Sequence, residues 1–275
     1  MRRIIDLSVP IMEGGGEPLP PKIDYHSHEW GAARMALAPI QDKRSWARSL
    51  RNLVGGLVSG RRVRAADFPN GVALAWEGVR TDTHHGTHID APWHYGPTSE
   101  GKPARTIDQL PLDWFMGAGV RLDLRHKPAG ATITVSDLER ALDAIGHTLS
   151  PREIVLIWTG ADENWGKPEY LERYCGLGAE GTRWLLEQGI KVIGTDAWSL
   201  DRPPLYMGRD FVQTGDPSYL WPAHFVGRER EYSQIEKLAH LGELPTATGY
   251  TVACFPVNIE RASAGWTRAV AIFED

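Results

Sequence analysis

The spacing of apolar and polar residues along the chain predicts a series of β-strands. Residues 117–124 alternate as a strand does, with Val120, Leu122 and Leu124 on one face. Residues 153–158 are predicted to form a strand, because Glu153 is followed by a short, continuous apolar run that stops at a Thr-Gly pair, which is typical of a strand buried on both faces. Further segments with the pattern of strands are 3–9, 190–195, 249–257 and 267–273.

Two helices are predicted between the central strands. The tetrapeptide Ser-Asp-Leu-Glu at 136–139 is a capping box, which places the start of one helix there and its end near Ile145. The second helix covers residues 178–188 and is closed by Gly189. Because helices and strands alternate, the middle of the chain predicts two β-α-β units within a mixed α/β fold. The chain has no internal repeat and no long polar linker, so we expect one domain over residues 1–275.

The segment 43–64 departs from this pattern because it is strongly basic and carries apolar residues at helical spacing. Its apolar positions are Trp46, Leu50, Leu53, Val54 and Leu57, and its basic ones are Lys43, Arg44, Arg48, Arg51, Arg61, Arg62 and Arg64. We interpret the segment as a helical insertion or arm whose polar face is solvated. The alternatives are a lid over an anionic substrate and an arm that packs on a partner subunit. Its glycines argue against binding to a membrane surface.

The composition narrows the classes of function. A hydrophobic content of 42% and a charged content of 24% are ordinary for a soluble globular protein. The formal net charge of −5 argues against a general nucleic-acid binder. No apolar run approaches the roughly 18 to 20 residues that span a bilayer, and Asp6 interrupts the start too early for a signal peptide. We therefore expect a cytoplasmic location, in which the thiols of Cys175 and Cys254 stay reduced and packed in the core.

The segment 84–94, His-His-Gly-Thr-His-Ile-Asp-Ala-Pro-Trp-His, carries the strongest signal for chemistry. Zinc, manganese and iron sites use imidazole nitrogens and carboxylate oxygens as ligands. Gly86 and Pro92 argue against a regular helix here, and an extended backbone repeats its side-chain direction every two residues. The even-numbered polar residues are therefore expected to face one point; they are His84, His88, Asp90 and His94. The segment predicts a site for a divalent metal, and the alternative is a hydrogen-bonded turn rich in histidine.

Eleven tryptophans are many for a chain of 275 residues. Trp93 lies inside the motif and Trp221 lies three residues before His224, so these two are our candidates for lining a pocket that accepts a flat aromatic substrate. The alternative is that they pack in the core or in a subunit interface. Other chemistries fit poorly, because the chain has neither a Gly-x-Ser-x-Gly elbow nor a glycine-rich phosphate loop.

The pattern His-x-Gly-Thr-His-x-Asp-x-Pro-x-His across 84–94 resembles in full the signature of the metal-dependent cyclase-like hydrolases. That family includes bacterial kynurenine formamidase, isatin hydrolase and polyketide cyclases. Supporting likenesses to its opening, central and closing strands occur at 5–11, 194–201 and 249–271, so the resemblance covers nearly the whole chain. It implies a swivelling β/β/α-type single domain, with a mixed β-sheet core flanked by helices, that assembles as a homodimer or homotetramer.

The resemblance also implies roles for individual residues of the motif. His84, His88 and Asp90 match the family's first metal ligands, and His94 matches the histidine that moves protons beside the metal. His85 occupies a variable position, and we expect it to contact the substrate or groups behind the ligands. The implied cofactor is a divalent metal, zinc or manganese, as one or two ions; ferrous iron also suits such ligands.

Two residues far from the motif match the second metal site of the family. In two-metal members, a distant His and a Glu twelve residues later add this site, with the Asp of the motif as a bridge. His224 and Glu236 have this spacing. The alternatives are a partly buried structural histidine for His224 and a solvated carboxylate at a helix start for Glu236.

The activity implied by the resemblance is hydrolysis of a small amide by metal-activated water. The substrate would be a cyclic aryl amide such as isatin or an arylformamide such as N-formylkynurenine, and His94 would take and return the proton. The length of the chain and the segment 43–64 favour the isatin-hydrolase-like side. One alternative is a biosynthetic cyclase or dehydratase that acts on a polyketide-like carbonyl substrate. Another is a non-catalytic, metal-dependent binding protein whose metal positions are filled entirely by protein ligands.

Overall fold

The computed structural model describes residues 2–14, 17–38, 41–60 and 62–274. The chain divides into two compact units, each with its own internal contacts. The first unit, called the main unit below, comprises Met1–Pro21 and Thr81–Asp275. The second, called the arm unit, comprises Lys22–Arg80.

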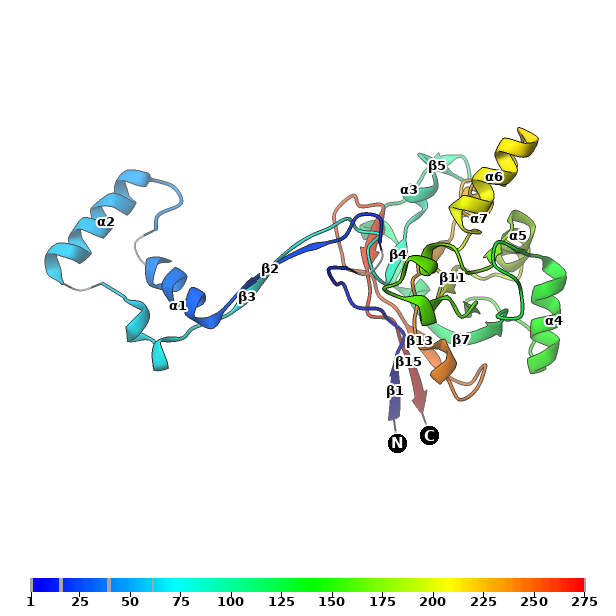
Figure 1. Cartoon of the computed structure of the whole chain (residues 1–275), viewed down its shortest axis with the longest axis horizontal. Helices are drawn as coiled ribbons and strands as arrows, with labels where there is room; N and C mark the ends of the chain where they lie inside the picture. Colours follow the sequence, from blue (N-terminus) through cyan, green and yellow to red (C-terminus); the bar gives the residue numbers. More distant parts are fainter. Residues whose placement is uncertain (1, 15–16, 39–40, 61, 275) are drawn as a thin grey trace. The chain divides into compact units, whose positions relative to one another are not determined.

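The main unit is built on a mixed sheet whose described part has nine strands (Figure 1). Across the sheet the order is β1 (Arg2–Asp6), β15 (Val270–Glu274), β13 (Thr251–Ala253), β7 (Met116–Asp123), β9 (Ile154–Trp158), β11 (Val192–Thr195), β12 (Ser233–Glu236), β4 (His88–Asp90) and β14 (Ala264–Trp266). Strands β7, β9, β11 and β12 are parallel, and the strands on either side pair antiparallel. As a result β1 and β15, near the two ends of the chain, lie side by side (Figure 1).

Helices and short two-stranded pairs complete the main unit. The helices are α3 (Pro92–Tyr95), α4 (Val135–Ile145), α5 (Ala179–Glu187), α6 (Pro204–Thr214) and α7 (Pro222–Val226). The short pairs are β5 (Thr98–Ser99) with β6 (Lys102–Pro103) and β8 (Thr132–Ile133) with β10 (Gly176–Leu177). No helix in the described parts of the chain has both the length and the apolar character that crossing a lipid bilayer requires.

The two predicted β-α-β units are confirmed as β7-α4-β9 and β9-α5-β11, with parallel strands. Alternation along β9 shows how the sheet divides the core: Ile154 and Leu156 belong to one buried cluster, and Val155 and Ile157 to another. The second cluster also contains Leu138 of α4 and buried leucines of α5, so these helices cover that face of the sheet. The mixed α/β architecture expected from the apolar pattern is therefore confirmed.

The start of α4 differs from the prediction. The N-cap is Thr134 rather than Ser136, because the Thr134 hydroxyl accepts a hydrogen bond from the amide of Asp137 and the Asp137 carboxylate accepts one from the amide of Thr134. A Thr-x-x-Asp pair thus forms the capping box, two residues before the predicted Ser-x-x-Glu pair. At the other end, Gly146 adopts φ +63°, the left-handed conformation that closes the helix.

Three strands in or beside the motif were not predicted as sheet strands from the apolar pattern. These are β4, β12 and β14, each three or four residues long and each rich in buried side chains. Strands this short contain too few alternations to stand out in the sequence. Glu236, for which a solvated position at a helix start was one interpretation, is instead the last residue of β12 and is buried.

The arm unit contains an antiparallel ribbon and two helices. The ribbon pairs β2 (Lys22–His26) with β3 (Trp76–Arg80), and the helices are α1 (His28–Leu37) and α2 (Trp46–Ser59). Helix α2 falls inside the basic segment 43–64; Ser45 caps its start, and Gly60 closes it at φ +66°. None of its residues is buried, and Trp46, Leu50, Val54 and Leu57 expose large apolar side chains.

Candidate metal centre

Strand β4 carries the central part of the motif and is paired on both sides. Its neighbours β12 and β14 are both antiparallel to it, and the register places Glu236 directly opposite His88. Because side chains alternate along a strand, His88 and Asp90 lie on the same face, and Glu236 joins them from the adjacent strand. The pairing of β12 with β4 is therefore enough to place the Glu236 carboxylate beside the motif.

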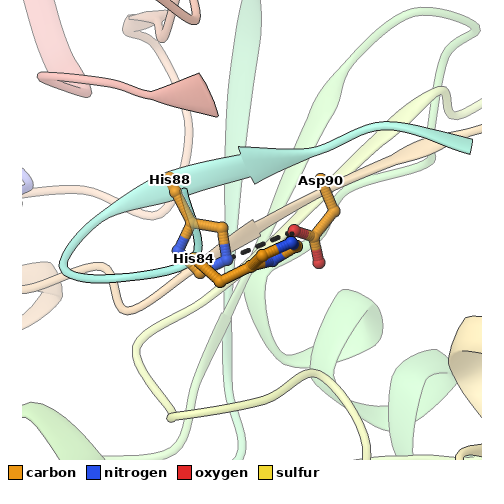
Figure 2. A group of neighbouring side chains, drawn as sticks. All are labelled: His84, His88 and Asp90. Atoms are coloured by element: carbon orange, nitrogen blue, oxygen red, sulfur yellow. Dashed lines mark ion pairs between the residues drawn. The ribbon is translucent and has the colours of Figure 1, made fainter. Parts of the chain in front are cut away.

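A tight turn returns His84 to the same face (Figure 2). Gly86 occupies the left-handed region at φ +64°, which a glycine adopts without strain. The turn places His84 Nδ1 at 2.9 Å from Asp90 Oδ1. His88 Nδ1 lies 2.8 Å from the carbonyl oxygen of Gly86, so its Nε2 points to Asp90 Oδ1 at 3.2 Å. Figure 2 shows both imidazoles directed at the Asp90 carboxylate.

His224 approaches the other oxygen of Asp90 from helix α7. Its Nε2 lies 3.8 Å from Asp90 Oδ2 and 3.7 Å from Glu236 Oε1. The ring is oriented by Asp201, whose carboxylate lies 2.5 Å from His224 Nδ1 and accepts hydrogen bonds from the amides of Ala223 and His224. A carboxylate behind an imidazole fixes the ring and leaves the opposite nitrogen free to act as a ligand.

His94 lies on α3, a single helical turn at the end of the motif, and no regular helix runs through 84–94, as Gly86 and Pro92 indicated. Pro92 occupies the first position of this single turn, where its missing N–H costs nothing. The His94 ring centroid lies 4.1 Å from that of His84 and 5.4 Å from that of His224. Desolvation within the site, together with these neighbouring rings, lowers the pKa of His94 to about 4 against the pull of Asp90, although the residue keeps solvent-exposed surface.

The polar atoms at the centre of this cluster fit a bound cation. His88 and Asp90 are fully buried, and among the described residues the contacts of His88 Nε2 and of both Asp90 carboxylate oxygens do not meet the geometry of a hydrogen bond. Burying polar groups without well-formed hydrogen bonds costs free energy, and a divalent ion with nitrogen and oxygen ligands would satisfy all three atoms. Two groups of three residues could each hold a cation, because the potential ligand atoms within each group lie within 4.8 Å of one another. One group is His84, His88 and Asp90; the other is Asp90, His94 and His224, so Asp90 belongs to both.

The electrostatics of the cluster lead to the same conclusion. Burial favours the neutral form of Asp90, but the surrounding histidines hold the pKa of its carboxyl well below the usual range. Burial and the nearby Asp90 carboxylate raise the pKa of Glu236. Two carboxylates in one buried pocket repel each other, and a cation between them would remove this repulsion.

The residues predicted to contact the substrate lie in different surroundings. His85 is buried and lines a cavity of about 140 Å³ beside His84, together with Lys237. Trp221 lines a separate apolar cavity of about 400 Å³, whereas Trp93 is 45% exposed. The two cavities share two lining residues, Pro18 and Trp198, which the sequence did not single out as pocket residues. Nothing in their local pattern distinguishes them from other surface prolines and tryptophans.

The two cysteines take no part in the centre. Cys175 and Cys254 are both buried in the core, as expected from the absence of any catalytic signature around them. Burial raises the pKa of the Cys175 thiol to about 12, so it stays protonated and unreactive at neutral pH.

The mixed sheet and the buried cluster of imidazoles and carboxylates place this protein among the metal-binding α/β proteins. Residues 5–202 match the family model described as "Putative cyclase", and the chain belongs to this Cyclase family. Membership confirms the resemblance that the motif indicated.

Curated relatives and solved structures agree with this assignment. The chain is 32% identical over 192 residues to the kynurenine formamidase of Bordetella petrii, covering 70% of this chain and 78% of that protein. It is 28% identical over 188 residues to the kynurenine formamidase of Erythrobacter litoralis, covering 68% and 72%. An isatin hydrolase bound to the product analogue thioisatinate matches with a TM-score of 0.70 at 19% identity, covering 100% of this chain and 93% of that one. The isatin hydrolase A of Ralstonia solanacearum gives 0.69 at 20% identity, with 99% and 92% covered; both likenesses show the fold.

Proposed function

We propose that this protein is a metal-dependent hydrolase of a small aryl amide. The observation that carries the proposal is the buried Asp90 carboxylate, which faces His84 and His88 with one oxygen and His224 with the other. Kynurenine formamidases among the curated relatives and isatin hydrolases among the structural neighbours support the reaction class. Both enzyme names describe the hydrolysis of a carbon–nitrogen bond next to a carbonyl.

His84, His88 and Asp90 would hold the first cation, which we take to be zinc or manganese. His224 and Glu236 would complete a second position that shares Asp90, so the site accepts one or two ions. When bound, such a cation supplies Lewis acidity, which acidifies water and polarises an amide carbonyl at neutral pH. The protein's own contribution is to orient the ligands and to keep His88, Asp90, His224 and Glu236 buried.

His94 is the group that we assign to proton transfer. With a pKa of about 4 the ring is neutral at pH 7, so a ring nitrogen is free to accept a proton from the attacking water. The residue keeps exposed surface, as a group that meets a substrate requires. The protonated ring would then donate to the leaving nitrogen. The alternative role, in which His94 is itself a ligand with Asp90 and His224, makes a different prediction for its removal and is tested below.

The substrate that we propose is a neutral, flat aryl amide. The apolar cavity of about 400 Å³ has two tryptophans among its lining residues, and it adjoins the smaller cavity at His84 through Pro18 and Trp198. A ring held between Trp198 and Trp221 would direct its carbonyl towards the cation ligands. Glu172 is the charged residue among those that line the apolar cavity, and no Lys or Arg is among them. This favours an uncharged cyclic amide such as isatin over a substrate that bears a carboxylate.

The arm unit supports a further proposal, assembly as a homo-oligomer. Residues 22–80 contain ten Lys and Arg against five Asp and Glu, whereas the rest of the chain contains 20 against 30. A basic arm whose helix α2 exposes Trp46, Leu50 and Val54 is complementary in charge to the main unit of a second copy. We propose that α2 is covered by a second copy of the chain in a homodimer or homotetramer.

The test of the proposed function combines metal analysis with a panel of substrates. Purified protein is stripped with a chelator and assayed with isatin, N-formylkynurenine, a lactone and an imide, before and after zinc or manganese is restored. We expect turnover to disappear on stripping, to return with the cation, and to be fastest with isatin. Equal turnover by the stripped and restored protein would refute metal dependence, and turnover of only the lactone would refute the aryl amide.

A further inference from the structure

Next to the centre lies a buried ion pair that the proposed reaction does not use. Glu17, near the end of the N-terminal segment of the main unit, and Lys237, directly after β12, each have a side chain that is only 4% exposed. Lys237 Nζ lies 2.6 Å and 2.9 Å from the two carboxylate oxygens of Glu17. Its third donor direction is filled by the carbonyl oxygen of His84 at 2.7 Å. The ammonium group therefore holds the residue that approaches Asp90 at 2.9 Å.

The backbone of Lys237 is tied to the same region. The residue adopts the left-handed conformation at φ +61°, which a non-glycine residue rarely occupies. Its carbonyl oxygen accepts a hydrogen bond from the Thr87 hydroxyl, and its amide donates to the carbonyl of Ala197 at 3.0 Å. Because Glu236 precedes it, Lys237 connects the turn between His84 and His88 to the strand that carries the distant carboxylate.

Glu17 connects this pair to the wall of the pocket. Its carboxylate accepts a hydrogen bond from Trp198 Nε1 at 3.1 Å and one from the amide of Gly86 at 3.4 Å. The following residue, Pro18, lines both cavities with Trp198. One carboxylate thus contacts the turn of the motif, the lysine behind it and the tryptophan that separates the two cavities.

We propose that Lys237 and Glu17 are positioning residues that set the affinity of the centre for its cation. The inference rests on the proposed function and assigns it two residues outside the ligand set. A buried ion pair is weak evidence for stability, because desolvation offsets much of the attraction. The pair matters here for position: Lys237 holds the backbone carbonyl of His84 and so fixes the point from which the imidazole reaches Asp90. The ring itself is also contacted by Ser263 Oγ, which lies 3.0 Å from its Nε2. Residues that orient ligands change metal affinity by about 10- to 100-fold when they are removed.

The experiment compares K237M with a matched control. Lys237→Met keeps the unbranched, apolar stem of the side chain but removes the ammonium group and its donors to His84 and Glu17. The control is Lys127→Met, which breaks another buried ion pair, with Asp137 at 2.6 Å, away from the centre. Calorimetric titration of the stripped proteins with Mn²⁺ gives the dissociation constant, and thermal unfolding of the stripped proteins gives their stability. We expect about 10- to 100-fold weaker Mn²⁺ binding by K237M and unchanged binding by K127M.

A double variant keeps the inference testable if K237M does not fold, since that variant leaves Glu17 buried and unpaired. E17Q/K237M removes both charges of the pair, so neither partner is left as a buried ion without the other, and we expect its Mn²⁺ binding to be weakened as in K237M. Mn²⁺ binding at the wild-type dissociation constant by folded K237M, or by E17Q/K237M, would overturn the positioning role. Failure of the wild-type protein to bind any cation would instead refute the proposed function itself, so the two failures are distinguishable.

Discussion

The two halves of the candidate centre are assembled by different means. His84, His88 and Asp90 lie within seven residues, and one glycine turn followed by one short strand brings them together. His224 and Glu236 are more than 130 residues further along, and they reach Asp90 through the β4–β12 register and through the carboxylate of Asp201. The positions of the local ligands depend on few contacts, so their spacing in the sequence is enough to predict them. The positions of the distant ligands depend on how the strands of the sheet pair.

The largest expected effect comes from the local half. His88→Ala removes the buried nitrogen that points to Asp90, so we expect cation binding to be abolished and kcat/KM to fall by more than about 10⁴-fold, above the range for a lone acid–base group. His147→Ala is the matched control, because His147 is a partly buried histidine that pairs with Glu153 at 3.0 Å and lies outside both ligand sets. Similar losses in both variants would mean that the loss comes from disturbed folding and not from a missing ligand.

Two roles are open to His94: proton transfer beside the first cation, or ligation of the second cation with Asp90 and His224. If it transfers protons, His94→Ala keeps its cation content while kcat falls by about 10²- to 10⁴-fold, and the mutation of the exposed His126 to Ala changes neither. Cation content by mass spectrometry and steady-state kinetics on the same preparation check this. A parallel loss of cation would instead assign His94 to the ligand set with Asp90 and His224.

The distant half is tested through Asp201 rather than through a ligand. Asp201→Asn keeps the size of the side chain but weakens its hold on His224 Nδ1, so we expect cation affinity at the second position to fall by about 10- to 100-fold. The first position should be unaffected, which a two-site calorimetric titration can resolve. Asp210→Asn, which perturbs a carboxylate paired with Arg202 instead, serves as the control. Equal weakening of both positions would show that the halves are not separable.

The smallest effect on chemistry is expected from the arm unit. Leu50→Glu places a charge on the exposed apolar face of α2 and should shift the protein towards monomers in light scattering at a given concentration. Asn52→Glu adds the same charge at another exposed position of the helix and should leave the oligomer intact. A wild-type protein that is already monomeric would contradict the proposed assembly. High salt should also weaken association, because the basic arm unit of one copy and the acidic main unit of the other are complementary in charge.

The comparison also explains what could be predicted from the sequence. The β-α-β units of the middle of the chain were predictable because Val120 and Leu122 belong to an alternating segment and 154–158 is an apolar run of the length of a strand. The start of α4 was misplaced because Thr134 and Ser136 both have a suitable acid three residues later, and packing decides between them. Proximity of His88 to Asp90 followed from their spacing alone.

The distant half could not be derived from periodicity. β12 is four residues long, and only the sheet register shows that Glu236 faces His88. The family resemblance supplied Glu236 and His224, whereas Glu17 and Lys237 have no signature in the sequence. Their contacts join residues 220 positions apart and exist only in the folded chain.

The central claim is that Asp90 joins both halves into one cation site. The most direct test is a crystal structure of the wild-type protein soaked with Mn²⁺, with anomalous scattering used to locate the metal. We expect an anomalous peak in contact with Asp90 and with His84 and His88, with a second peak towards His224 if two ions bind. Mn²⁺ bound elsewhere, with Asp90 making no contact to it, would contradict the assignment of Asp90 as the shared ligand.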